Sequence, residues 1–328
     1  MSKRVFLKSL AAFALGGSAL VRGDEAEPRP TMCPPNAPPG KRRRANRNGV
    51  WVPAAKERTT DEWKAAFDRM RVAGVDGVLL QAFDGRHAYW ATAALPLKSD
   101  RLGSLVPLAK AAGLEVHAWM ATLPYGVEGF RAKHPDWYLG ASGILDPASA
   151  PVREHLAHLV AELAALPDVT GVHADELHYP EGVLREETAP AQRQALTDLV
   201  NDHLVPAAHR RERSLTAAVL PDIGLARDRS GQDWTAWKLN AFFPRLYQSL
   251  YNGDLAWIER HAKQAAAAVS VPVCIGLDVQ SLSFPDLARA VRAALDGGAS
   301  GVSLHSLDAM TEEKWMGLQI VVVGQRPD

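Results

Sequence analysis

The sequence predicts an α/β protein whose main domain is a (β/α)8 TIM barrel. From residue 49 onward, short apolar runs alternate with amphipathic helices, and eight such units follow one another in about 280 residues, close to the ~250 residues usual for this barrel. The longest connections follow the second to fifth runs, where the loops of a barrel's active site lie. An open, doubly wound sheet shares the alternation, but eight units favour closure.

Each unit opens with a run expected to form a strand. The eight runs cover residues 49–54, 74–83, 114–124, 168–175, 214–221, 241–248, 272–279 and 301–307. A helix is expected behind each run. The first begins near Thr59, which stands three residues before Glu62 in the spacing of a capping box. Later helices are expected over 102–112, 152–163, 192–211 and 311–322.

The first 48 residues differ from the barrel domain. Residues 1–23 have a basic start and an apolar stretch too short to cross a bilayer, which predicts an export signal. It resembles the twin-arginine type with Lys3 in place of the first arginine, and an ordinary secretory signal is the alternative. Residues 24–48 are rich in proline and arginine, which predicts a disordered linker. The barrel domain would then cover 49–328, and the protein would be periplasmic or secreted.

The composition is typical of a globular protein, with 47% apolar residues and 37 basic against 37 acidic ones. This balance gives no indication of a nucleic-acid partner. Two cysteines, Cys33 and Cys274, exclude a disulfide scaffold and a cysteine-rich zinc site, and Cys274 is expected to pack in a strand. No glycine-rich phosphate loop follows a strand. We therefore expect no cofactor and no bound metal, and, since no heptad pattern is present, a monomer.

The fourth strand ends in the stretch GVHADELHYP, residues 171–180. Alternate residues of a barrel strand point inward, so His173 and Asp175 should face the interior. Glu176 then falls at the rim, where the chain turns into the loop. The sequence thus predicts two acids with different surroundings at the mouth of the barrel.

Other polar and aromatic side chains are expected at the same end. They are Asp84 behind the second strand, His117 and Trp119 on the third, His178 and Tyr179 behind the fourth, Arg245 and Tyr247 on the sixth, Asp278 on the seventh and His305 on the eighth. Aromatic rings stack on the apolar face of a sugar, and polar groups bind its hydroxyls. Apart from Asp278, we expect these side chains to bind a saccharide.

Cleavage of a glycosidic bond usually needs one carboxylic acid as proton donor and a second carboxylate as base or nucleophile. Two carboxylates in contact disfavour double ionisation, so one pKa should rise. We predict Glu176 as the general acid and Asp175 as the group that orients the substrate or stabilises a charged intermediate. Asp278 is the candidate base or nucleophile.

Several of these residues also have structural interpretations. Asp175 could serve only as the partner of an arginine such as Arg245. Glu176 and His178 could be solvated loop residues, and His173 is better interpreted as a core histidine with a satisfied hydrogen bond.

The segment ILDPASAPVREHLAHLVAELAALPDVTGVHADELHYP, residues 144–180, resembles a signature of bacterial glycosyl hydrolase-like proteins, the family 10-like glycosylhydrolases. That signature reads L-D-P, P-x-V-R-x-x-L, a helix, D-G-I-H-x-D-D and then Y-P. The runs GVWV at 49–52, HAWM at 117–120 and FFPRLY at 242–247 resemble its first, third and sixth strands.

This resemblance implies a TIM barrel, export and a glycosidase activity on a cell-surface or extracellular polysaccharide. The sequence departs from the signature at Thr170 and Glu176, where the family has Asp, and at Arg245, where it has Gln. The charge of Arg245 could bind an acidic sugar or pair with Asp175.

The leading hypothesis is an exported glycoside hydrolase that acts on a polysaccharide by carboxylate acid/base chemistry. A non-catalytic, carbohydrate-binding degenerate barrel is the first alternative, because no Glu follows the seventh strand. A metal-dependent hydrolase or deacetylase is the second. It would use His117, His173, Asp175 and His305, although the first strand lacks the H-x-H pair common in such barrels.

Overall fold

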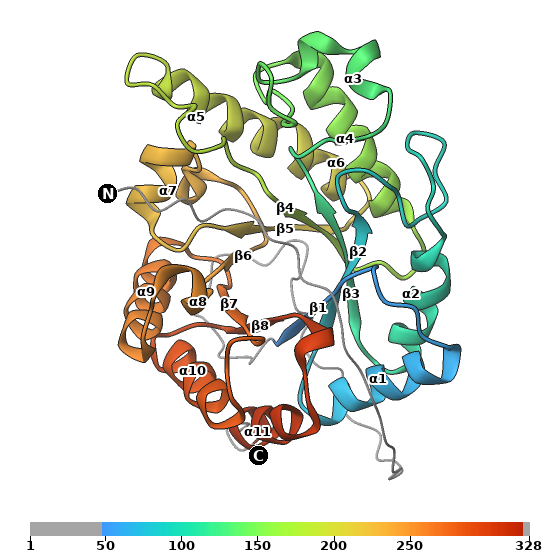
Figure 1. Ribbon diagram of the computed structural model, residues 1–328, viewed down its shortest axis with the longest axis vertical. Coiled ribbons are helices and arrows are strands. Elements are labelled where there is room, and N and C mark those ends of the chain that lie inside the picture. The colour runs from blue at the N-terminus through green and yellow to red at the C-terminus, as the bar shows by residue number, and fades with distance from the viewer. Residues whose placement is uncertain (1–47, 324–328) are drawn as a thin grey trace.

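A computed structural model describes residues 48–323 of the chain as eight parallel strands surrounded by helices (Figure 1). The strands are β1 (Gly49–Val52), β2 (Gly77–Phe83), β3 (Glu115–Ala121), β4 (Gly171–Asp175), β5 (Ser214–Val219), β6 (Ala241–Pro244), β7 (Cys274–Asp278) and β8 (Gly301–His305). Each lies within one of the eight predicted runs.

The sheet closes on itself. Its strands pair in the order β6-β5-β4-β3-β2-β1-β8-β7, and the two ends meet because Phe242 N donates to Pro272 O at 3.0 Å. A second bridge joins Arg245 to Gly276. A side chain at Gly276 would bring its Cβ to 3.3 Å from the Cα of Arg245, so glycine permits this close approach. The predicted barrel is confirmed, and the open sheet is excluded.

The helices form the outer ring of Figure 1. They are α1 (Thr60–Val72), α2 (Arg101–Ala111), α3 (Phe130–Lys133), α4 (Ala150–Ala165), α5 (Ala189–Asp198), α6 (Val205–His209), α7 (Ile223–Ser230), α8 (Gln248–Tyr251), α9 (Leu255–Ala268), α10 (Phe284–Asp296) and α11 (Glu312–Val323). The capping box before α1 is confirmed, because Glu62 N donates to Thr59 Oγ1 and Thr59 N donates to a Glu62 carboxylate oxygen.

The single helix expected over 192–211 is instead three elements. A π-helical stretch, Leu199–Leu204, separates α5 from α6. Pro206 follows directly inside α6. Because proline has no N–H and its ring clashes with the preceding turn, regular hydrogen bonding is interrupted there.

The described part of the chain begins one residue before the predicted barrel boundary. The predicted linker ends at Asn48, but this residue is buried: its backbone N–H donates to Asp76 and its side-chain oxygen accepts from Val302 N. It therefore ties β1 to its neighbours β2 and β8 and belongs to the fold. The predicted signal (1–23) and the rest of the predicted linker lie outside the described residues.

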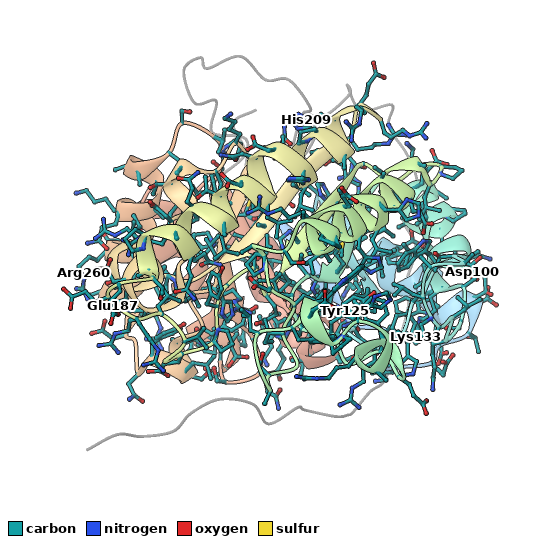
Figure 2. The ribbon with its side chains drawn as sticks, turned by 90° about the horizontal axis from the view of Figure 1, so that it is seen from above. Asp100, Tyr125, Lys133, Glu187, His209 and Arg260 are labelled. Carbon is teal, nitrogen blue, oxygen red and sulfur yellow. The ribbon has the colours of Figure 1, made fainter. Side chains whose placement is uncertain are left out.

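The connections behind the strands gather at one end of the barrel. Figure 2 views the molecule from above, at 90° to Figure 1: His209, which precedes β5, lies toward one end, and Tyr125 and Lys133, which follow β3, lie toward the other. The long connections predicted behind β2, β3 and β4 are confirmed, but the one predicted behind β5 is wrong, because α7 begins directly after residues 220–222. Between residues 48 and 323, no helix is both long and apolar enough to cross a bilayer.

The barrel interior holds a small aromatic cluster. Trp51 meets Trp119 and His173 edge-on, each with ring centroids 4.8 Å apart, and Cys274 is buried in the same interior. Val172 and Ala174 pack instead in the larger core outside the strands. The predicted alternation along β4 is therefore confirmed.

Candidate functional site

Two acids lie where β4 ends at the mouth of the barrel. Asp175, the last residue of β4, is only 7% exposed. Glu176 follows with a positive φ of 55°, in the left-handed region that few non-glycine residues adopt. Its backbone N–H donates to Asp175 Oδ1 at 2.8 Å. This turn separates the two carboxylates, as the alternation predicted: one is held in the barrel mouth and the other on the rim.

Arg245, which follows β6, joins both acids. Its Nη1 lies 2.6 Å from Glu176 Oε1 and 3.3 Å from Asp175 Oδ1. All three side chains are at least two-thirds buried. Removing one partner of a buried ion pair leaves a charge without compensation and destabilises the folded protein. Each of the three side chains therefore depends on the others.

Each acid has one further side-chain partner. His178 Nε2 shares a hydrogen bond of 2.9 Å with Glu176 Oε2. Trp119 Nε1 donates to Asp175 Oδ2 at 3.2 Å. Trp119 is 9% exposed and lies one strand layer below, because it pairs in register with His173 rather than with Asp175. Its ring therefore supports Asp175 from beneath.

The pKa values of the two acids shift in opposite directions. Burial raises the pKa of Asp175; Arg245 opposes this shift, and the adjacent charge of Glu176 adds to it. Burial also acts to raise the pKa of Glu176, but the shorter contact with Arg245 and the contact with His178 outweigh it and hold that pKa well below the usual range. If the pair carries one proton, Asp175 therefore holds it.

The other side of the mouth carries the third acid, Asp278, at the end of β7. Ser249 Oγ donates to Asp278 Oδ2 at 2.5 Å, and Gln280 N donates to Oδ1 at 3.1 Å. Asp278 pairs in register with His305 on β8. Its hydrogen-bond donors are thus neutral, in contrast to those of Glu176.

Two aromatic groups lie between the acids. The rings of Tyr247 and His305 are 5.4 Å apart. Burial raises the pKa of Tyr247, and charges on both sides of the mouth, Arg245 and Asp278 among them, act on its hydroxyl. Burial lowers the pKa of His305 to about 4, so this imidazole is neutral at neutral pH. Both residues lie where sequence analysis expected them.

Three residues that were expected to contact the substrate have other surroundings in the structure. His117 is fully buried in the barrel interior and burial lowers its pKa to about 4. Tyr179 is 1% exposed. Asp84 accepts hydrogen bonds from the backbone of Arg86 and His87 and from the Tyr89 hydroxyl. The first two have no surface for a sugar, so they do not belong to the site. Asp84 stabilises its own loop, and its contact with a sugar stays a prediction.

His173 has the core position that the structural interpretation gave it. Its Nδ1 shares a 2.8 Å hydrogen bond with Thr216 Oγ1, and the ring packs edge-on against Phe243. The second alternative function required His117, His173, Asp175 and His305 around one metal. Within residues 48–323, no three His, Cys, Asp or Glu side chains are arranged to hold a metal ion.

Sequence analysis missed the segment directly behind β6. Gln248 Nε2 donates to the backbone oxygen of Asp278 at 3.0 Å, and Ser249 reaches its carboxylate. Two residues later Tyr251 is 43% exposed. The aromatic residues of LYQSLY after a predicted strand were the available signal.

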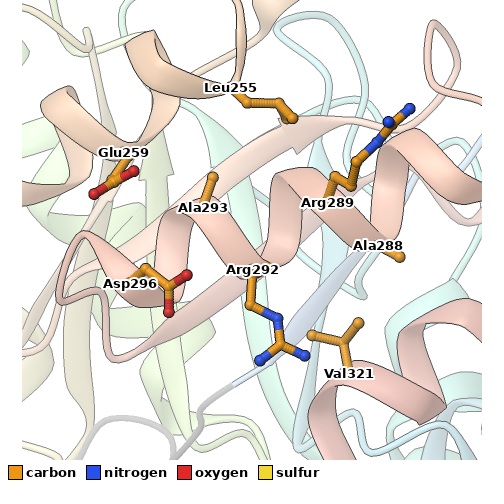
Figure 3. A pocket seen from close by; sticks show the side chains of 8 residues that line it. All are labelled: Leu255, Glu259, Ala288, Arg289, Arg292, Ala293, Asp296 and Val321. Atoms are coloured by element: carbon orange, nitrogen blue, oxygen red, sulfur yellow. The ribbon is translucent and has the colours of Figure 1, made fainter.

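A shallow hollow also lies on the outside of the barrel, between α9, α10 and α11 (Figure 3). It is lined by Leu255, Glu259, Ala288, Arg289, Arg292, Ala293, Asp296 and Val321. None of the candidate site residues lines it. The acids at the mouth, and not this open hollow, are therefore the candidate site.

Solved structures similar to this chain share its barrel. An endo-1,4-β-mannanase from Rhizomucor miehei aligns with a TM-score of 0.64 at 11% identity over 85% of this chain and 94% of its own. A chitinase from Chromobacterium violaceum aligns with a TM-score of 0.58 at 12% identity over 86% and 100%. An α-L-fucosidase from Paenibacillus thiaminolyticus gives 0.61 at 11% identity, and this chain spans only 49% of it.

These likenesses show the fold, a (β/α)8 barrel of the kind that these glycoside hydrolases have. No family model and no curated protein matches the sequence. The resemblance to the family 10-like glycosylhydrolases therefore stays a prediction.

Proposed function

We propose that this protein is an exported glycoside hydrolase that cleaves a glycosidic bond in a polysaccharide. The observation that carries the proposal is the pair Asp175 and Glu176, whose pKa values are shifted in opposite directions at the mouth of the barrel. The raised pKa of Asp175 suits a proton donor, and acid/base catalysis needs in addition a second carboxylate, which is Asp278 in this proposal. The barrel shared with enzymes named as a mannanase, a chitinase and a fucosidase supports the same reaction class.

In this proposal the general acid is Asp175, and not Glu176 as the sequence suggested. Glu176 is held ionised by Arg245 and His178, so it is a poor proton donor. Asp175 retains its proton to higher pH because of burial, so it is the general acid for the leaving oxygen. Glu176 fixes the Arg245 guanidinium, and through it the position of Asp175.

Asp278 is the second carboxylate, acting as base or nucleophile. Its neutral hydrogen-bond donors, Ser249 and the backbone of Gln280, orient it without compensating its charge. A carboxyl separation of about 5 Å from the acid corresponds to retention, and about 6.5 to 9.5 Å to inversion. His178, Tyr247 and His305 are the proposed hydroxyl contacts of the sugar.

A second candidate function is carbohydrate binding without cleavage. One observation favours it: Arg245 lies against both acids at once, an arrangement that also serves as a purely structural ion-pair network. In that case Asp175 supports the mouth of the barrel and transfers no proton.

Reducing-sugar release distinguishes the two functions. The wild-type chain and the variant Asp175→Asn are incubated with plant and bacterial polysaccharides of neutral, amino and acidic sugars. We expect one substrate class to be cleaved by the wild type and Asp175→Asn to be slower by about 100-fold or more, the usual contribution of a general acid. Asp286→Asn, on the exposed surface of α10, is the matched control.

Equal rates for the wild type and Asp175→Asn would remove Asp175 from catalysis. Binding of a polysaccharide without release of reducing ends, even after long incubation, would support the binding protein instead. Export is tested separately, by locating the full chain in the periplasm or medium and comparing it with a chain that lacks residues 1–23.

A further inference from the structure

The segment behind β6 is attached to the mouth of the barrel at two points. Gln248 Nε2 donates to Asp278 O at 3.0 Å and to Ser281 Oγ at 2.8 Å. Ser249 Oγ donates to the Asp278 carboxylate. The short helix α8 is therefore fixed against the loop that follows β7, beside the candidate second carboxylate.

Tyr251, the last residue of α8, is the outermost of three packed aromatic rings, here called the ring pile. Its ring stacks on Trp257 with centroids 5.5 Å apart and planes 24° apart. Trp257 in turn packs on the buried His261, with centroids 4.6 Å apart. The backbone at Gly253 also lies close to the Trp257 ring, since a side chain at this position would collide with the ring.

This pile leaves Tyr251 43% exposed, next to Leu250 at 56%. Its hydroxyl is within electrostatic reach of the site: burial raises the pKa of Tyr251, with Arg245 lowering it and Glu176 raising it further. An aromatic ring that is exposed, yet fixed by packing before any ligand arrives, binds with little loss of side-chain entropy.

We propose that Tyr251 is an outer subsite of the barrel mouth, where its ring stacks on an uncharged hexose of the bound saccharide. The inference rests on the proposed function for the neighbouring carboxylates but concerns binding alone. Aromatic rings present a flat apolar surface and a polar edge, which match the C–H face and the hydroxyls of a pyranose.

The charges near this subsite favour a neutral sugar over an acidic one. The Arg245 Nη1 group already contacts Asp175 and Glu176. The amine of Lys314, which is within reach of the Asp278 charge, donates to the backbone oxygens of Val279 and Ala309. A uronate would therefore face the charges of Glu176 and Asp278, whose neighbouring cations are already engaged, a repulsive arrangement.

Calorimetric binding on the full chain tests this subsite. The probes are cellohexaose, mannohexaose, chitohexaose and hexagalacturonate, each titrated into the wild type, Tyr251→Phe and Tyr251→Leu. Leu preserves apolar packing on Trp257 but has no ring, whereas Phe keeps the ring. Met316→Ala is the matched control, because Met316 is an apolar side chain of similar exposure, 50%, on another helix, α11. Thermal unfolding confirms that all variants are folded.

We expect at least one neutral hexasaccharide to bind, and Tyr251→Leu to bind it about three- to tenfold more weakly. Tyr251→Phe and Met316→Ala should stay within about twofold of the wild type. Wild-type affinity in Tyr251→Leu, no binding of any neutral probe, or tightest binding of hexagalacturonate would each overturn the inference.

Chromatography of the same samples tests the proposed function independently. If the saccharide is cleaved but its affinity does not depend on Tyr251, the proposed hydrolase function stands and the proposed subsite is wrong. Affinity that depends on Tyr251, without cleavage, would keep the subsite and remove the hydrolase.

Discussion

The two sides of the barrel mouth hold their carboxylates in different ways. On the β4 side, Asp175 and Glu176 are both paired with Arg245 and largely buried. On the β7 side, Asp278 accepts hydrogen bonds from the neutral Ser249 hydroxyl and Gln280 N–H. The difference shows how one fold gives acids of the same type different surroundings. A nearby cation and burial act in opposite directions on the first side, and neutral donors orient the carboxylate on the second.

Within the β4 side, distance decides which acid stays ionised. Arg245 Nη1 is closer to Glu176, at 2.6 Å, than to Asp175, at 3.3 Å. Glu176 also has His178. The cation therefore stabilises the charge of Glu176 more and lowers its pKa, whereas burial raises the pKa of Asp175.

Removing the cation should produce the largest change in stability. We expect Arg245→Leu to lower the free energy of unfolding by about 3–5 kcal/mol at pH 7, because two buried carboxylates lose their partner. The folded-state pKa of Glu176 is lowered, so its stabilisation is present above the ordinary glutamate pKa and is lost as pH falls. The deficit of the variant should therefore shrink at pH 4. Urea unfolding at both pH values measures it.

A matched control for this experiment is Arg227→Leu. Arg227 also pairs with a carboxylate, that of Asp228, but both side chains are about half exposed, and such surface pairs contribute little to stability. Equal losses in the two variants, or a loss for Arg245→Leu that does not depend on pH, would contradict the difference between the buried and exposed pairs.

Changing the other side of the mouth should affect activity more than stability. We expect Asp278→Asn to change the free energy of unfolding by no more than about 1 kcal/mol, because an amide can keep hydrogen bonds with neutral donors. Turnover of the identified polysaccharide should fall about 100-fold or more, since the second carboxylate is lost. Asp286→Asn again serves as control. Full turnover in Asp278→Asn would show that Asp278 is not the second carboxylate of the reaction.

The sequence predicted the barrel and the inward direction of Asp175, because the order and alternation of the strands determine both. The pairing of Arg245 with Asp175 is one of two alternatives that the sequence leaves open, and the structure shows this contact. The sequence did not predict how far below the mouth of the barrel each inward-facing side chain lies. His117 shares its orientation with Trp119, but it pairs in register with Gly171, at the start of β4, and so is buried below the mouth. Alternation along a strand determines whether a side chain faces the interior of the barrel. The stagger between neighbouring strands determines in which layer of the interior that side chain lies.

The roles of the two acids could not be predicted either. They depend on a difference of less than 1 Å between two contacts of Arg245, which joins residues almost 70 positions apart. The ring pile under Tyr251 was missed for a related reason: it forms between α8 and α9, and no periodic pattern links a four-residue helix to the rings that support it.

The assignment of the proton to Asp175 is the central claim, and carboxyl carbon NMR of the full chain, labelled at Asp and Glu side chains, tests it most directly. Resonances are assigned with Asp175→Asn and Glu176→Gln, and followed as pH is lowered from 8. We expect Asp175 to take up its proton first, at a pH above the ordinary aspartate value, while Glu176 stays ionised to much lower pH. Protonation of Glu176 before Asp175 would contradict the account.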